Sequence, residues 1–207
     1  MNIIYRPIEE KDFAPLEQII RDTWNYDTYY DEQLAKDCAE MYLAGCLNNF
    51  TFSEVAVLEG ETVGVILVND KKNHHPNPTY QKKWEAVLER LDQTEAGRTA
   101  FNSFDKVEGL YHEMYIKTNK AYDGELAFFL MNDKHQGLGI GKKLYLDALA
   151  YFKAQGVESF YLFTDTQCNF GFYDHIGMNR IEEIQHLPTA GKKQSDTIFY
   201  MYEAIIN

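Results

Sequence analysis

The sequence has little cysteine and no long apolar run. Its three cysteines, Cys38, Cys46 and Cys168, form no C-x-x-C pair, so neither a disulfide framework nor a zinc ribbon is indicated. No apolar run reaches the roughly 18 residues of a membrane span, and the first residues lack the pattern of a secretory signal. We therefore expect a soluble cytoplasmic protein with no membrane partner.

Positive charge is also scarce. The 207 residues include 20 lysines and arginines against 32 aspartates and glutamates, a formal net charge of -12. This balance disfavours a nucleic-acid partner and favours a cationic one. With 45% hydrophobic residues, 13 phenylalanines and 15 tyrosines, the chain can still build the core of an ordinary globular protein.

The first third of the chain shows alternating strand and helix signals. Residues 3–7 read as a short strand ended by proline, and apolar residues follow at helical spacing over 13–20. A second helix is expected over about 31–47. Two β-rich runs within 51–70, separated by a turn at Gly60, predict a β-hairpin.

A polar stretch interrupts this pattern at about 71–122. We expect one helix around 80–91 and a helical or irregular piece around 101–115. The stretch is interpreted as an insertion within a single domain that spans residues 1–207.

The last third repeats the alternation in a compact form. It reads as a strand over 125–131, a glycine-rich turn over 136–141, a helix over 140–154, a strand over 157–163 and a short helix over 169–175. Two further strands follow. A strand, turn, helix and strand of this length predict a parallel pair of strands with a right-handed crossover.

The glycine-rich turn is the sharpest motif in the sequence, and it consists of Gln136, Gly137, Leu138, Gly139, Ile140 and Gly141. It follows a strand and begins a helix, so unpaired backbone N–H groups and the positive end of the helix dipole face outward there. Such a turn favours an anion such as a pyrophosphate. Lys134, Lys142 and Lys143 add positive charge beside it.

Two well-known phosphate-binding patterns do not fit this turn. The dinucleotide pattern G-x-G-x-x-G begun at Gly137 requires glycine where the chain has Lys142. The Walker pattern requires glycine where the chain has Gln136, and serine or threonine where it has Lys143.

The spacing Gln136-x-x-Gly139-x-Gly141 resembles the Q/R-x-x-G-x-G/A acyl-CoA motif of the GNAT N-acetyltransferase superfamily. Downstream features of that family stand in the same order here: Asn169, then Phe172-Tyr173, then Gly177-Met178. Residues 125–178 resemble the cofactor-binding half of the family, and residues 3–68 are similar to its amino-terminal half. Asp133, where many members have proline, and Met178, where phenylalanine is usual, depart from the pattern; residues 73–123 have no assignable counterpart.

The resemblance implies an α/β fold with a mixed, mostly antiparallel sheet of six or seven strands, flanked by helices and splayed at a central parallel pair. It also implies acetyl-CoA as the donor, no metal, and transfer to a primary amine by direct attack in a ternary complex. The expected acceptor is a small cationic metabolite or an exposed amino group of a peptide. The alternative is a non-catalytic acyl-CoA-binding regulatory module, and a homodimer is left open.

The resemblance further implies a set of site residues. Those expected to bind the cofactor are Met131, Gln136, Gly137, Leu138, Gly139, Ile140, Gly141, Lys142 and Asn169. The backbone N–H of Met131 would hold the thioester carbonyl, and Asn169 would bond the pantetheine arm or cap the short helix. Tyr173 is the candidate acid for the leaving thiolate, with a packed aromatic as its alternative.

Glu125 is the candidate general base. Strand alternation places it on one face with Ala127, Phe129 and Met131, and a water chain is the competing route. Asp165, at the end of the next predicted strand, is a second carboxylate near the expected acceptor, or it closes a turn.

Other reactive residues carry weaker signals. Nothing in the sequence orients Cys168 toward His175, so covalent catalysis is disfavoured. The adjacent His74 and His75 point in different directions and have no third ligand nearby, which indicates a loop rather than a metal site.

Overall fold

The computed structural model describes residues 2–186 and 197–206. Within them a seven-stranded sheet has the order β1-β2-β3-β4-β5-β7-β6. The strands are β1 (Ile3–Arg6), β2 (Phe52–Leu58), β3 (Glu61–Asp70), β4 (Gly124–Met131), β5 (Ser159–Asp165), β6 (Asn179–His186) and β7 (Thr197–Ile205). All neighbours are antiparallel except β4 and β5, which are parallel. The predicted mixed, mostly antiparallel sheet is confirmed.

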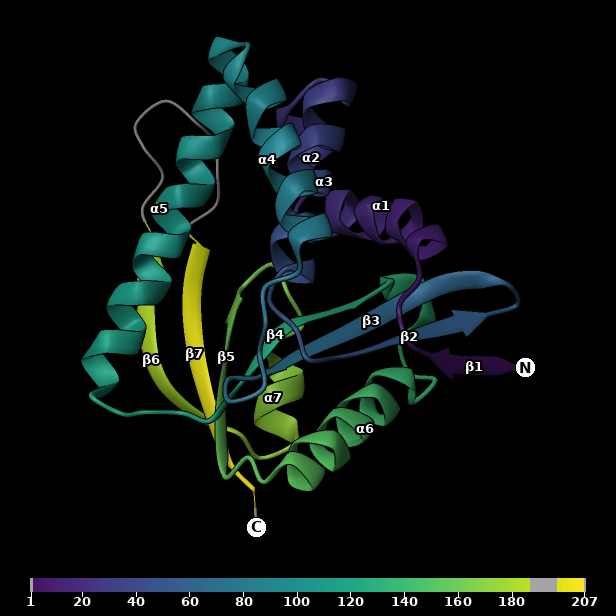
Figure 1. Cartoon of the computed structure of the whole chain (residues 1–207), viewed down its shortest axis with the longest axis vertical. Coiled ribbons are helices and arrows are strands. Elements are labelled where there is room, and N and C mark those ends of the chain that lie inside the picture. The colour runs from purple at the N-terminus through teal and green to yellow at the C-terminus, as the bar shows by residue number, and fades with distance from the viewer. Residues whose placement is uncertain (1, 187–196, 207) are drawn as a thin grey trace.

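Helices cover both faces of this sheet (Figure 1). The helices are α1 (Phe13–Thr23), α2 (Tyr26–Tyr29), α3 (Glu32–Leu47), α4 (Pro78–Asp92), α5 (Glu95–Thr118), α6 (Ile140–Gln155) and α7 (Gly171–His175), with short 3-10 turns η1 (Glu10–Asp12) and η2 (Asp133–His135). Helices α1 to α5 lie on one side, and α6 and α7 lie on the other (Figure 1). None of the helices in the described ranges is long and apolar enough to cross a membrane.

The helix boundaries follow from local chemistry. Asp31 caps α3 by accepting a hydrogen bond from the Leu34 N–H at 3.0 Å, and Thr94 caps α5 by accepting from the Gly97 N–H at 2.9 Å. Gly156 ends α6 in the left-handed region at φ 73°. The polar stretch 71–122 contains α4 and α5, while its status as an insertion in a single domain stays a prediction.

The parallel strands β4 and β5 pair over a very short length. Their register contains only Gly124 opposite Phe160 and Glu125 opposite Tyr161. Beyond these residues β4 stays with β3, and β5 stays with β7 along its full length. The sheet therefore opens between β4 and β5, as the family resemblance predicts.

A β-bulge changes the direction of the side chains on β4. Leu67 of β3 lies opposite Phe128, but the next residue, Val68, lies opposite Leu126. Ala127 is therefore the additional residue in β4, and alternation is reversed across it.

The bulge corrects one prediction about Glu125. Simple alternation places Glu125 on one face with Ala127, Phe129 and Met131, and this is wrong. Leu126 packs in the same cluster as Phe129 and Met131, on the side of α6. Glu125 is on the opposite side of the sheet, where α3 and α5 lie.

Two carboxyl groups meet where α6 packs on β2. Burial, followed by a hydrogen bond to Asp147 and its charge, raises the pKa of Glu54 to about 7. The folded protein therefore binds a proton more tightly than the unfolded chain, in which glutamate titrates near 4.5. The resulting stabilisation of the folded protein is complete below about pH 4.5 and is lost as the pH rises through 7.

Glu54→Gln should remove this pH dependence, because glutamine imitates the protonated carboxyl group. Denaturant unfolding should show a variant more stable than the native chain at pH 8, by on the order of 1 kcal/mol, with the difference shrinking toward pH 5. Glu61→Gln, at an exposed carboxylate on the neighbouring strand β3, is the matched control. Equal destabilisation of Glu54→Gln at both pH values would contradict the prediction.

Candidate active site

A large cavity occupies the opening between β4 and β5. Its volume is about 1380 Å³, and residues from both sides of the sheet line it. The glycine turn and the start of α6 form one end, which we call the loop end. At the other end, called the aromatic end, the lining includes Trp24, Tyr42, Tyr111, Phe163 and Asp165.

The glycine turn has the geometry of an anion cradle. Gly137 and Gly139 have φ of 80° and 75°, a left-handed conformation that disfavours other residues. Gly139 is the N-cap of α6, and no side chain in the described residues caps that terminus. The first N–H groups of α6 are therefore left for a ligand in the cavity.

The residues of the turn contribute in different ways. Gln136 donates from its side-chain amide to Asp133 at 2.7 Å, which holds the turn to η2. Ile140 is buried in the core, so only its backbone can face a ligand. Leu138 is 41% exposed and does not line the cavity, whereas the exposed Lys142 does.

The strand β4 directs backbone N–H groups into the opening. The Asn132 N–H donates to the Val63 carbonyl at 2.8 Å. In an antiparallel pair, hydrogen-bonded and non-hydrogen-bonded residue pairs alternate, so the next pair, Gly64 opposite Met131, is not hydrogen-bonded. The N–H groups of Met131 and, two residues earlier, Phe129 consequently point away from β3 and toward the gap. The pairing register therefore adds the Phe129 N–H, which the sequence analysis did not name, to the backbone donors that face the gap.

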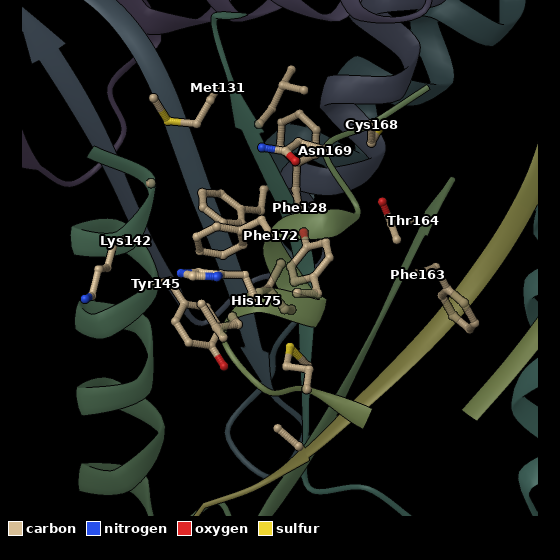
Figure 2. A pocket seen from close by; sticks show the side chains of 18 of the residues that line it. Phe128, Met131, Lys142, Tyr145, Phe163, Thr164, Cys168, Asn169, Phe172 and His175 are labelled. Carbon is tan, nitrogen blue, oxygen red and sulfur yellow. The ribbon is translucent and has the colours of Figure 1, made fainter. Parts of the chain in front are cut away.

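The segment around α7 supplies side chains to the loop end. Asn169 lines the cavity, and α7 has Phe170 as its N-cap with no side-chain cap, so the capping role suggested for Asn169 is not found. Asn169, Phe172 and His175 come from this segment, and Tyr145 comes from α6 on the other side of the pocket (Figure 2). Tyr173 is buried and also lines the cavity.

A polar network fixes α7 against the sheet. The Arg180 guanidinium donates to Asp174 at 2.7 Å and to the Tyr202 hydroxyl at 2.9 Å, and it lies 4.2 Å from the centre of the Tyr200 ring. The Tyr202 hydroxyl donates to Asp174 at 2.9 Å. Asp174 adjoins Tyr173, so this network restrains the position of Tyr173. Burial raises the pKa of Tyr173, which keeps its phenol protonated.

Asp165 is a buried carboxylate at the aromatic end. It is 5% exposed, and it accepts hydrogen bonds from the Gln167 N–H at 2.7 Å and from the Trp24 indole Nε1 at 3.2 Å. The bond to Gln167 confirms that Asp165 closes a turn. Desolvation nevertheless raises the pKa of Asp165 above its usual value, because these neutral donors compensate its charge only in part.

Glu125 is not brought to the cavity. It accepts a hydrogen bond from the Asn49 side chain at 3.0 Å and lies opposite Tyr161, where β4 and β5 still pair. It does not line the cavity, and Phe129 lies four residues, about 13 Å, further along the strand. Asp165 instead lies four residues beyond Tyr161, and so reaches the level of Phe129 across the opening.

The remaining reactive groups give no second site. Burial raises the pKa of the Cys168 thiol, which disfavours the thiolate needed for nucleophilic attack. The His74 ring is within 3.0 Å of the Asn48 carbonyl oxygen. Across residues 2–186 and 197–206, no group of three or more His, Cys, Asp or Glu side chains is arranged to hold a metal ion.

Comparison with known proteins identifies the family of the chain. The model of the acetyltransferase (GNAT) family matches residues 13–178, so the chain belongs to this family. Its members use acetyl-CoA as co-substrate and act on amine acceptors. No curated protein sequence matches the chain significantly.

Solved structures of low sequence identity share the fold over the whole chain. An N-acetyltransferase from Staphylococcus aureus Mu50 has 14% identity and a TM-score of 0.59, with 100% of each chain covered. Arylalkylamine N-acetyltransferase 2 from Aedes aegypti has 18% identity and a TM-score of 0.60, again with 100% of each chain covered. Ard1 from Thermoplasma volcanium has 14% identity and a TM-score of 0.57, with 100% of this chain and 99% of the other covered.

The Trp24 hydrogen bond to Asp165 can be tested with fluorescence, because the chain has only two tryptophans. In Trp84→Phe, the emission of Trp24 should follow the titration of Asp165, and Asp165→Asn should abolish that step. Nuclear magnetic resonance of the Asp165 carboxyl carbon should show a higher pKa in Trp24→Phe, since a donor to the charged form is lost. An unchanged pKa in Trp24→Phe would contradict the assigned contact, and Trp84→Phe is its matched control.

Proposed function

We propose that this protein transfers an acetyl group from acetyl-CoA to a primary amine, by direct attack of the amine within a ternary complex. The observation that carries the proposal is a single cavity through the opened sheet. An anion cradle lies at its loop end, outward-facing strand amides lie in the gap, and the buried carboxylate of Asp165 lies at its aromatic end. One passage therefore joins a phosphate site to an amine site.

The loop end fits the diphosphate of the donor. The α6 N-terminus lacks a side-chain cap, and a Cβ built at Gly137 or Gly139 would meet no atom within 4 Å, so the turn borders open space. The N–H groups of Gly139, Ile140, Gly141 and Lys142 would bind the diphosphate, with the Lys142 ammonium adding charge. Gln136 and Gly137 would shape the turn, and Asn169 would hold the pantetheine arm.

The opening between the strands suits the reacting carbonyl. Acetyl-CoA supplies an activated thioester, and its carbonyl oxygen gains negative charge as the amine attacks. The N–H groups of Phe129 and Met131 point into the gap and would hydrogen-bond that oxygen. These donors belong to a strand fixed by β3, so their positions are set before the substrate binds.

The amine must lose a proton before it attacks, because an alkylammonium group has a pKa near 10.4. Asp165 would hold the ammonium at the aromatic end through its negative charge. Its raised pKa also makes it a better proton acceptor than an exposed aspartate. Glu125, in contrast, would reach the amine only through a chain of water molecules, because it lies outside the cavity.

Tyr173 is proposed as the acid that protonates the departing thiolate. It lines the cavity beside Phe129, with ring centres 6.5 Å apart. Burial raises its pKa and so keeps the phenol protonated at neutral pH, which is the state a proton donor needs. The network of Arg180 and Asp174 restrains α7 and therefore this hydroxyl.

Gly139→Glu should abolish acetyl-CoA binding, because it places bulk and negative charge against the proposed diphosphate site. Calorimetric titration should show a loss of affinity of about 100-fold or more, and 100-fold is equivalent to one or two charge-assisted hydrogen bonds. Gly156→Glu is the matched control: Gly156 has φ 73° against 75° for Gly139, and it lies at the other end of α6. If both variants bind acetyl-CoA as the native protein does, the loop does not hold the donor.

Tyr173→Phe should lower kcat by about 100-fold, in the range of general acid catalysis, with little change in acetyl-CoA affinity. The matched control is Tyr145→Phe, a buried tyrosine of α6 that lines the same cavity. Amine-dependent release of CoA is the measurement. An unchanged kcat would assign Tyr173 to packing alone, and tight acetyl-CoA binding without turnover of any amine would favour a non-catalytic acyl-CoA-binding module.

A further inference from the structure

We infer that the aromatic end of the cavity selects an amine with one positive charge and a flat apolar body, and that α5 helps to set this preference. The inference rests on the proposed function and adds the class of acceptor to it. It is carried by the walls of the aromatic end, by the isolation of the Asp165 charge and by the place of Tyr111 on α5.

The walls of the aromatic end are rings from four separate segments. Tyr111 of α5 is stacked on Phe163 of β5, with ring centres 4.4 Å apart and an interplanar angle of 10°. Trp24, just after α1, packs against Tyr42 of α3 at 5.1 Å. Flat, apolar walls favour a flat, apolar ligand, and ring faces also attract a cation.

Asp165 supplies one anchoring charge at this end. Its carboxylate takes part in none of the ion pairs found among residues 2–186 and 197–206. Buried charges in proteins are normally paired. A bound ammonium group would provide the missing partner.

The other two carboxylates that line the cavity offer no comparable anchor at the aromatic end. Asp133 is exposed and lies at the loop end, beside the glycine turn. Glu203 accepts from the Lys120 ammonium at 2.8 Å and from the Tyr122 hydroxyl at 2.6 Å. A second ammonium group on the substrate would have no comparable partner, so a polyamine or an aminoglycoside would bury an unpaired charge.

Helix α5 contributes one ring to the walls of the aromatic end and packs against a second ring of those walls. Tyr111 lines the cavity directly and also packs edge-to-face on Phe199 of β7 at 5.7 Å. Phe104, two turns earlier on α5, contacts Tyr42 with ring centres 6.4 Å apart. The predicted insertion at 71–122 therefore contributes directly to the proposed acceptor site.

The test compares three acceptors of different chemistry with acetyl-CoA as donor: 2-phenylethylamine, spermidine and a short peptide with a free amino terminus. CoA release should give a kcat/KM for 2-phenylethylamine at least tenfold above the other two. Asp165→Asn should lower that kcat/KM by about 100-fold, as expected for loss of a buried charge partner. Tyr111→Leu should lower it about tenfold through KM, because a stacking wall is removed.

Tyr115→Leu is the matched control, since Tyr115 lies one turn further on α5 and does not line the cavity. Thermal unfolding of each variant would establish that the losses are not failures of folding. Equal losses of kcat/KM in Tyr111→Leu and Tyr115→Leu would overturn the role of α5 in recognition.

Different outcomes would contradict the acceptor class and the acetyltransferase activity. Faster turnover of spermidine or of the peptide would overturn the inference and leave the acetyltransferase proposal standing. If no amine is acetylated, the proposed function fails, and calorimetric titration of 2-phenylethylamine into the acetyl-CoA-saturated protein still decides the inference. Binding that requires Asp165 would uphold the inferred class of ligand, and absence of binding would overturn it.

Discussion

The short pairing of β4 and β5 is the constraint on which the rest of the site depends. Parallel strands normally continue their hydrogen bonds along the sheet, but here only two residue pairs are formed. The opening leaves backbone donors of β4 without a strand partner and creates a passage from one face of the sheet to the other. The glycine turn and Asp165 can share one cavity only because the sheet opens there.

An opened sheet needs compensating contacts. On one side, β4 is held by its full pairing with β3, including the bulge at Ala127. On the other side, β5 is held along its length by β7. The rings of Tyr111, Phe163 and Phe199 pack together across α5, β5 and β7, and apolar burial of this kind contributes the largest stabilising energy in a core.

Much of the fold and the loop end could be predicted from the sequence, because their signals are local. Caps, glycines and periodicity act within a few residues, so α6 and its turn were identified in the correct place. The aromatic end depends on distant contacts: Trp24 and Asp165 are 141 positions apart. The bulge at Ala127 carries no glycine or proline signal, so simple alternation put Glu125 on the wrong face.

The two ends of the cavity are built from different groups, backbone at the loop end and side chains at the aromatic end. The loop end relies on backbone N–H groups and on the conformational freedom of Gly137 and Gly139, which few substitutions can preserve. The aromatic end relies on side chains such as Tyr111 and Phe163, which a single codon change can replace. In the proposed function, substitutions at the aromatic end would therefore change the acceptor while the backbone groups that hold the donor stay in place.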